Sequence, residues 1–414
     1  MSGIECILHS LDVLLSEEFL SRTVPLPYSH LHGSAPPSVP YLPSYAKFLQ
    51  KTIRSLLAGG GHRSEVGGQG DETFPLKGLK VCVNAGNGAG GFLADCLAEL
   101  GADTSSSIHL EPDGSFPNHI ANPEDVRAIE ITRQAVLQGD ADIGICLDTD
   151  ADRVGIVEGG RCRGNKNAGR LLNRNGLVAL VSKIALRGVP PPHEGASSSE
   201  RAVIVTDSAT SEGVTKFIED ALGGRHVRYK KGYRYVIERA REEPGSVAAV
   251  ECSGHGAWRD NGWVDDGCYT AVRIITELMV ASYQEAESNL FSLSQLITEL
   301  QEPIESVELR CNILGGRESM EDVAGLAAQT LREIADAVPS WQVEPINYEG
   351  LRVKVGDGTG WCMLRPSLHE PIISIQIESN LVGGVKDISC VLFVGLREKI
   401  PDNMLDLEPL LKTL

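Results

Sequence analysis

From Leu76 onward, short apolar runs alternate with helical patterns along the chain. The predicted strands are Leu79–Ala85, Ala141–Leu147 and Val154–Val157, and the predicted helices are Phe92–Leu100 and Leu177–Leu186. Strands that alternate with helices indicate βαβ units and a parallel sheet. This alternation places the chain in the α/β class. Its 42% content of hydrophobic residues argues against a mainly disordered chain.

Changes in composition divide the 414 residues into four parts. We expect residues 1–75 to be a tail and linker with one helix, 76–198 and 200–290 to be α/β domains, and 300–414 to be an α+β domain. The further predicted strands are Ala202–Thr206, Val247–Glu251, Glu305–Asn312, Leu351–Val355, Trp361–Arg365 and Ile372–Ser379. The further predicted helices are Tyr45–Leu57, Ser211–Ala221, Tyr235–Arg241, Tyr269–Tyr283, Met320–Ala337 and one that begins at Ile388.

The formal net charge of −18 argues against a general nucleic-acid binder and against attraction to an anionic membrane. No apolar run reaches the roughly 18 residues that a membrane-spanning helix needs. The first 20 residues carry four acidic and no basic side chains, unlike a signal or transit peptide. Ten cysteines without a Cys-x-x-Cys pair favour buried, reduced thiols. We therefore expect a cytoplasmic protein, or a plastid one if its true N-terminus is missing.

The sharpest local feature is Asp148-Thr149-Asp150-Ala151-Asp152-Arg153, directly after an apolar strand. Three alternating carboxylates repel one another, and their oxygens suit a hard cation such as Mg²⁺. An EF-hand would need Gly and Glu where the chain has Arg153 and Gly159, so that reading fails. A solvated acidic turn is the alternative. Beside a bound cation, Arg153 is well placed to hold a phosphoryl group.

A second feature, Gly86–Gly91, lies between a predicted strand and a predicted helix and satisfies Gly-x-Gly-x-x-Gly. Glu111 stands 20 residues beyond Gly91, where a ribose-binding acid would be sought. The segment Asp103–His109 contains three consecutive serines and makes a poor second strand. A tight strand-to-helix turn is therefore the favoured interpretation, and a nicotinamide dinucleotide site is the alternative.

Two further loops carry polar side chains that could bind a ligand. Glu251 and Ser253, on the loop that ends at His255, could hydrogen-bond vicinal sugar hydroxyls. Arg365, Ser367 and His369, on a loop bounded by prolines, form a plausible phosphate cradle. Taken alone, the first loop is better interpreted as a polar turn, and the second could equally be a structural turn.

In this order and at these spacings, the motifs resemble the α-D-phosphohexomutase family, which includes phosphoglucomutases, phosphomannomutases and phosphoglucosamine mutases. The similar segments are the metal loop (148–153), the turn that opens the family's second domain (86–91), the sugar loop (251–255), the phosphate loop (365–367) and a Phe-Pro-Asn-His…Asn-Pro-Glu stretch (116–124). That last stretch has no obvious chemistry. The resemblance covers about residues 76–400, and variants such as Gly232–Arg234 look closest to the plant and algal branch.

The resemblance implies four domains around a central cleft, three of them α/β and the last α+β. It also implies an Mg²⁺-dependent isomerase that interconverts hexose 1-phosphate and hexose 6-phosphate, with glucose, mannose or glucosamine as the sugar. A phosphoserine in the first domain would donate the phosphoryl group, and a bisphosphate intermediate would return one to it. The implied roles are metal binding (Asp148, Asp150, Asp152), stabilisation of the transferred phosphoryl (Arg153), proton transfer or substrate binding (His255), sugar binding (Glu251, Ser253) and phosphate binding (Arg365, Ser367, His369).

One family motif has no counterpart in the chain. The family serine lies in Thr-Ala-Ser-His-Asn-Pro, whereas Ser29-His30 lacks the flanking residues. We therefore expect most of the first family domain to be absent and the metal loop to be more exposed than catalysis requires. The alternative function is a catalytically silent relative that binds sugar phosphates.

Overall fold

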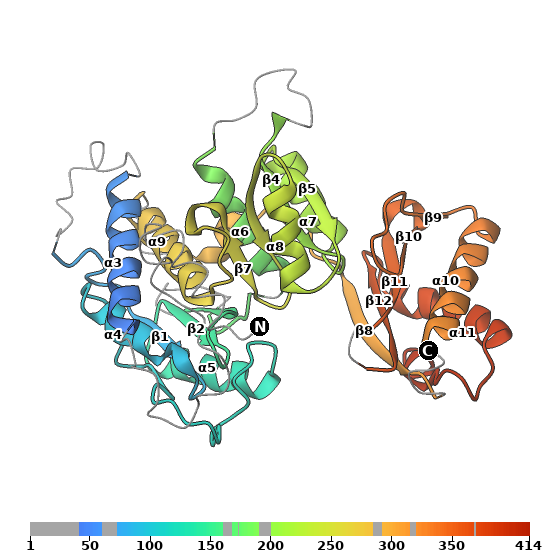
Figure 1. Ribbon diagram of the computed structural model, residues 1–414, viewed down its shortest axis with the longest axis horizontal. Helices are drawn as coiled ribbons and strands as arrows, with labels where there is room; N and C mark the ends of the chain where they lie inside the picture. Colours follow the sequence, from blue (N-terminus) through green and yellow to red (C-terminus); the bar gives the residue numbers. More distant parts are fainter. Residues whose placement is uncertain are drawn as a thin grey trace, which may run out of the picture. The chain divides into compact units, whose positions relative to one another are not determined.

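The structure, a computed structural model, describes residues 41–59, 73–159, 168–172, 174–189, 200–284, 292–314, 320–367 and 370–414. These residues form two compact units, and we describe each by itself (Figure 1). The first unit comprises the described parts of Met1–Thr206, Ile218–Val227 and Val236–Glu299. The second comprises those of Asp207–Phe217, Arg228–Tyr235 and Leu300–Leu414.

The first unit contains a three-stranded sheet with the order β1 (Val81–Asn84), β2 (Ile143–Leu147), β3 (Val154–Glu158). Strands β1 and β2 are parallel, whereas β2 and β3 are antiparallel. The predicted parallel arrangement is therefore confirmed for β1 and β2 and wrong for β3. Only six residues connect β2 to β3, and a parallel crossover needs a dozen or more.

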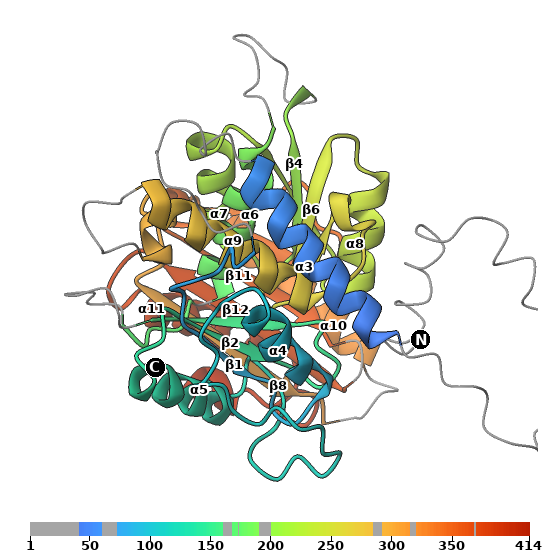
Figure 2. The same ribbon diagram turned by 90° about the vertical axis from the view of Figure 1, so that its left-hand side faces the viewer.

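Helices cover both faces of this sheet, as the α/β class predicts. Helix α5 (Val126–Gln138) packs so closely on β2 that a Cβ at Gly144 would lie 2.3 Å from Val136 Cγ2. Helices α4 (Phe92–Ala98) and α9 (Gly267–Gln284) also pack on the sheet. Figures 1 and 2 show the sheet between α5 and α9.

A second, four-stranded sheet has the order β5-β4-β6-β7. Strands β4 and β6 are parallel, and β6 and β7 are antiparallel. Helix α6 packs on β6 and α9, and the predicted helix 211–221 divides into α7 and one π-helical turn. The bounds are β4 (Val203–Asp207), β5 (Arg225–Tyr229), β6 (Ser246–Val250), β7 (Gly256–Trp258), α6 (Arg174–Arg187), α7 (Glu212–Lys216), the π turn (Phe217–Ala221) and α8 (Tyr233–Glu242).

The second unit is built on an antiparallel five-stranded sheet with the order β8-β12-β11-β10-β9. Helices α10 and α11 pack together and on this sheet, and α12 packs on α11 and β8. The predicted bounds of β8, α10, β10 and β12 are confirmed to the residue. The bounds are β8 (Glu305–Asn312), α10 (Met320–Ala337), β9 (Trp341–Val343), β10 (Leu351–Val355), β11 (Gly360–Pro366), β12 (Ile372–Ser379), α11 (Gly384–Lys399) and α12 (Glu408–Leu411).

Helix α3 (Leu42–Gly59) belongs to the first unit, although it precedes the sheet by more than 20 residues. It packs against α4 and α9, and Figures 1 and 2 both show it beside them. Leu49 and Ile53 on its inner face have no exposed surface. Among the described segments, none of the helices has the length and apolarity that crossing a membrane requires.

Candidate active site

The metal loop, residues 148–153, connects β2 to β3. Carboxylate oxygens of Asp148, Asp150 and Asp152 all lie within 4.8 Å of one another. Ala151, with φ of +63°, turns the chain between the last two acids. An all-oxygen donor set of this kind fits a hard cation such as Mg²⁺.

The three carboxylates differ in burial. Asp148 is 2% exposed, Asp152 is half-buried and Asp150 is exposed. The expectation of a generally exposed loop is therefore wrong for Asp148, because this residue directly follows a fully buried strand. Burial raises the pKa of Asp150, and the charge of Asp148 raises it further. Burial likewise raises the pKa of Asp152. A bound cation would relieve this accumulation of negative charge.

Arg153 closes the loop back onto its first carboxylate. Its backbone N–H donates to Asp148 Oδ1 at 3.0 Å and its Nε donates to Asp148 Oδ2 at 2.8 Å. Its Nη1 donates to Asn122 Oδ1 at 3.2 Å. The guanidinium is thus held from two sides, beside the carboxylates that would bind the cation.

The sugar loop lies against the metal loop within the first unit. Arg153 and His255 form an antiparallel backbone bridge, and Val154 donates its N–H to Gly254 O at 3.2 Å. With φ of +100°, Gly254 has a conformation that favours glycine, and a Cβ there would lie 2.7 Å from Val154 O. The structure therefore brings Asp148, Asp150, Asp152, Arg153 and His255 together.

His255 lies between two carboxylates. Its Nδ1 is 2.7 Å from Asp265 Oδ2 and 3.7 Å from Asp152 Oδ1. Burial alone would lower the pKa of His255, but the hydrogen bond with Asp265 and the surrounding carboxylates outweigh it and raise the pKa to about 9. Nearby, Ser253 Oγ donates to Glu251 Oε2 at 3.1 Å, and Glu251 is 3% exposed. The sequence did not single out Asp265, although two acids and a glycine before an apolar helix could have drawn attention to it.

The glycine-rich turn supports the metal loop from its other side. A Cβ at Gly88 would lie 2.6 Å from Thr149 O and 2.9 Å from Asp148 O. Ala89 donates its N–H to Thr149 O at 2.8 Å. This close approach supports the interpretation of residues 86–91 as a packing turn between β1 and α4.

The stretch 116–124 acquires a role that the sequence did not reveal. Asn118 Nδ2 donates to Asn87 Oδ1 at 2.8 Å, and His119 Nε2 lies 3.0 Å from Asn84 Nδ2. Asn122 is the acceptor that anchors Arg153. These side chains position the turn and the arginine.

The phosphate loop belongs to the second unit. Arg365 lies on β11, paired with Ser374 of β12, and is half-buried. Ser367 donates its N–H to Ile372 O at 2.9 Å and accepts from Glu370 N–H at 3.4 Å. His369 lies outside the described residues, as does Ser29. The described residues on either side of this loop are thus held by the pairing of β11 with β12, and the roles of its side chains remain predictions.

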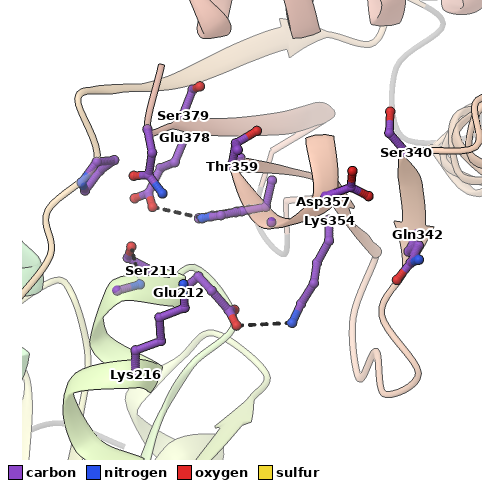
Figure 3. A pocket seen from close by; sticks show the side chains of 16 residues that line it. Ser211, Glu212, Lys216, Ser340, Gln342, Lys354, Asp357, Thr359, Glu378 and Ser379 are labelled. Atoms are coloured by element: carbon purple, nitrogen blue, oxygen red, sulfur yellow. Dashed lines mark hydrogen bonds and ion pairs between the residues drawn. The ribbon is translucent and has the colours of Figure 1, made fainter. Parts of the chain in front are cut away.

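A separate polar cavity of about 430 Å³ lies in the second unit (Figure 3). Lys354 and Glu212 form an ion pair of 3.1 Å at its wall, and Trp361 donates to Glu378 at 2.8 Å. None of the residues predicted for the active site lines it.

Comparison with known proteins identifies two domains of one family. Residues 69–161 match the family model "Phosphoglucomutase/phosphomannomutase, alpha/beta/alpha domain II", and residues 177–302 match domain III. Relatives include a phosphoglucomutase of Neisseria gonorrhoeae, 26% identical over 75% of this chain and 59% of its own length. A phosphomannomutase/phosphoglucomutase of Pseudomonas putida is 29% identical over 73% and 58%. The chain thus spans about three fifths of the length of the relatives it matches.

Solved structures show the same fold. A phosphoglucomutase/phosphomannomutase family protein of Burkholderia thailandensis has a TM-score of 0.64 at 23% identity, covering 86% of this chain and 66% of that one. An N-acetylphosphoglucosamine mutase of Aspergillus fumigatus, solved with GlcNAc-6P and magnesium, has a TM-score of 0.54 at 14% identity over 85% and 70%. The two family models together match more than half of the chain. The chain belongs to the phosphoglucomutase/phosphomannomutase family of α-D-phosphohexomutases.

Proposed function

We propose that the chain acts as a phosphohexomutase-type intramolecular phosphotransferase that interconverts hexose 1-phosphate and hexose 6-phosphate through a bisphosphate intermediate. The observation that carries the proposal is the convergence of three carboxylates, one anchored arginine and one histidine held by a carboxylate. Phosphoryl transfer depends mainly on positioning and on neutralising charge, and this arrangement supplies both.

Each side chain has a defined task in this proposal. Asp148, Asp150 and Asp152 hold Mg²⁺, which when bound neutralises the charge of the phosphoryl oxygens. Arg153, anchored by Asp148 and Asn122, donates to those oxygens. His255, whose raised pKa of about 9 keeps the imidazole protonated near neutral pH, assists substrate binding or donates a proton, and Asp265 stabilises the imidazolium.

The remaining predicted residues bind the substrate. Glu251 accepts hydrogen bonds from sugar hydroxyls, and Ser253 donates and accepts them. Arg365, Ser367 and His369 hold the phosphate group that does not react. The magnesium complex of the Aspergillus fumigatus relative supports the choice of cation, and the sugars named for the relatives are glucose, mannose and N-acetylglucosamine.

A turnover assay tests the proposal. The chain is incubated with Mg²⁺, glucose 1-phosphate or mannose 1-phosphate, and a catalytic amount of the matching 1,6-bisphosphate, and the 6-phosphate is followed by ³¹P NMR. We expect turnover in the wild type and its loss in Asp150→Asn, whose exposed side chain makes general unfolding a poor explanation. Equal turnover in both proteins contradicts the proposed metal site.

The second candidate function is a catalytically silent sugar-phosphate binder. It is favoured by the lack of a Thr-Ala-Ser-His-Asn-Pro segment in the chain. Calorimetric titration with glucose 1-phosphate separates the two candidates. Binding without turnover, with the bisphosphate present, favours the silent binder, and binding with turnover favours the mutase.

A further inference from the structure

The turn Asp265–Gly267 connects three parts of the first unit that are far apart in the sequence. Its first residue, Asp265, holds His255 Nδ1 at 2.7 Å and accepts from Gly256 N–H at 3.1 Å. Its second residue, Asp266, accepts from the Tyr45 hydroxyl of helix α3 at 2.5 Å. Its third residue, Gly267, contacts the metal loop. One turn therefore joins the proposed proton carrier, the metal loop and a helix more than 200 residues away.

The contact of Gly267 with the metal loop is close. Its N–H donates to Ala151 O at 3.0 Å, and a Cβ at this position would lie 2.8 Å from Ala151 O and from Arg153 O. Ala151 stands between two of the proposed metal ligands. A displacement of the turn is therefore transmitted directly to the backbone of the metal loop.

Asp266 fixes the turn because its buried carboxylate accepts three hydrogen bonds. Asp266 is 7% exposed. Oδ1 accepts from Tyr45 OH and from Tyr269 N–H at 2.8 Å, and Oδ2 accepts from Asn261 Nδ2 at 3.3 Å. When a buried carboxylate loses a hydrogen-bond donor, its desolvation is no longer compensated and the buried state is destabilised. The loss of the Tyr45 hydroxyl would therefore favour movement of the turn.

The ring of Tyr45 is held independently of its hydroxyl. Its centroid lies 5.6 Å from that of Phe92, at the start of α4, and 6.3 Å from that of Phe48. Phe48 in turn stacks on Tyr269 of α9 at 6.1 Å. A Tyr45→Phe substitution therefore keeps the packing of α3 and removes only the hydrogen bond to Asp266.

We propose that Tyr45 of helix α3 is a positioning residue for the active site, acting through Asp266 on His255 and on the metal loop. The proposal rests on the proposed function, because it assigns Tyr45 a part in the same site. It makes the docking of α3 a condition for the geometry of His255 and of the three carboxylates.

The test compares Tyr45→Phe with Gln50→Ala in the full chain. Gln50 also docks α3, but it donates to Cys96 O of α4 at 3.2 Å and to Oε2 of Glu99, just after α4, at 2.7 Å, away from the turn. Two readouts need no substrate: the affinity for Mn²⁺ followed by electron paramagnetic resonance, and the imidazole ¹⁵N signals of histidine-labelled protein. Loss of one set of signals in His255→Asn identifies His255.

We expect Tyr45→Phe to shift the His255 imidazole signals and to weaken Mn²⁺ binding by about tenfold. This is the lower end of the roughly 10- to 100-fold loss of metal affinity that follows mutation of residues that support metal ligands. Gln50→Ala should leave both unchanged even if it lowers the melting temperature. Unchanged His255 signals in Tyr45→Phe overturn the proposal, whether or not the wild type binds Mn²⁺. Equal effects of both variants overturn it too, because they assign the effect to helix docking in general.

This experiment separates the proposal from the proposed function. If the wild type shows no mutase turnover while Tyr45→Phe shifts the His255 signals, the proposed function fails and the positioning role stands. If turnover is present and Tyr45→Phe changes neither readout, the positioning role fails and the proposed function stands.

Discussion

Gly88 offers a direct test of how the glycine-rich turn supports the metal loop. With φ of −86° and ψ of −164°, its backbone conformation is open to any residue. Only the space around it requires glycine. A Cβ would lie 2.6 Å from Thr149 O and 2.9 Å from Asp148 O, whereas ordinary contacts begin at 3.4 Å. Gly88→Ala therefore forces the metal loop and the turn apart.

The size of the effect follows from these distances. Restoring ordinary contact with Thr149 O requires a shift of roughly 0.5–1 Å, and overpacking of this kind typically costs about 1–3 kcal/mol. Replacing glycine by alanine also restricts the unfolded chain, which offsets about 0.4–1 kcal/mol. We expect a net loss of about 1–2 kcal/mol in the free energy of unfolding. Metal affinity should fall as well, because ligand geometry tolerates only about 0.5 Å.

The assay is urea-induced unfolding followed by far-UV circular dichroism, with Mn²⁺ affinity measured in parallel. Gly114→Ala is the matched control, because it lies between β1 and α5 and nothing lies within 4 Å of a Cβ placed there. We expect the control to be neutral or slightly stabilising. If Gly88→Ala matches the control in both stability and Mn²⁺ affinity, the turn does not support the metal loop.

Three further predictions concern other parts of the chain. Burial alone would raise the pKa of Glu212, but Arg228 and Lys354 hold it at about 2. Its stabilising contribution should therefore be present above pH 4.5 and lost as the pH falls toward 2. The free energy of unfolding of Glu212→Gln, measured by urea titration, should depend less on pH in that window than that of the wild type, and an equal dependence contradicts the ion pairs. Cys390 is exposed and the other seven described cysteines are buried, so Cys390→Ser should remove one fast-reacting equivalent in a thiol titration with Ellman's reagent, whereas Cys82→Ser should remove none. Asn122→Ala should lower the free energy of unfolding by about 1 kcal/mol, measured by urea titration, because Asn122 Oδ1 accepts from Arg153 Nη1 and from Glu124 N–H. A neutral result would contradict a stabilising role for these two hydrogen bonds.

The elements that the sequence predicted best are those with a clear periodic pattern of apolar and polar residues within their own length. Strand β12 alternates apolar and polar residues from Ile373 to Glu378, and α10 has a clear apolar face with Val323, Ala327 and Leu331 buried. Their bounds follow from local chemistry. Helix α5 was missed because only Ala128, Thr132 and Val136 are buried along it, although Asp125 caps its start. Strand β5, Arg-His-Val-Arg-Tyr, is half-buried throughout and lacks an apolar signal.

The acidic and glycine motifs of the candidate site were visible in the sequence, but the partners that hold them were not. The spacing of Asp148, Asp150 and Asp152 is local, so one loop brings their oxygens together. The partners of Arg153 and His255 are Asn122 and Asp265. Asn122 precedes its partner by 31 residues, and nothing local distinguishes it from any other asparagine at a turn. The antiparallel direction of β3 also depends on pairing, although the shortness of its connection could have predicted it.

The stretch 116–124 shows why residues without reactive groups can identify a site. Asn118 and His119 hold the turn at Asn87 and Asn84, and Gly88 of that turn contacts the backbone of the metal loop. Asn122 reaches the same loop by holding Arg153. Both routes end at residues 148–153, so a change in either stretch moves the carboxylates without altering any of them. Chemistry at a metal loop requires the carboxylate side chains, and it also requires the backbone around them to be fixed to within a fraction of an ångström. A motif that lacks reactive groups but fixes that backbone is therefore as characteristic of the site as the carboxylates themselves.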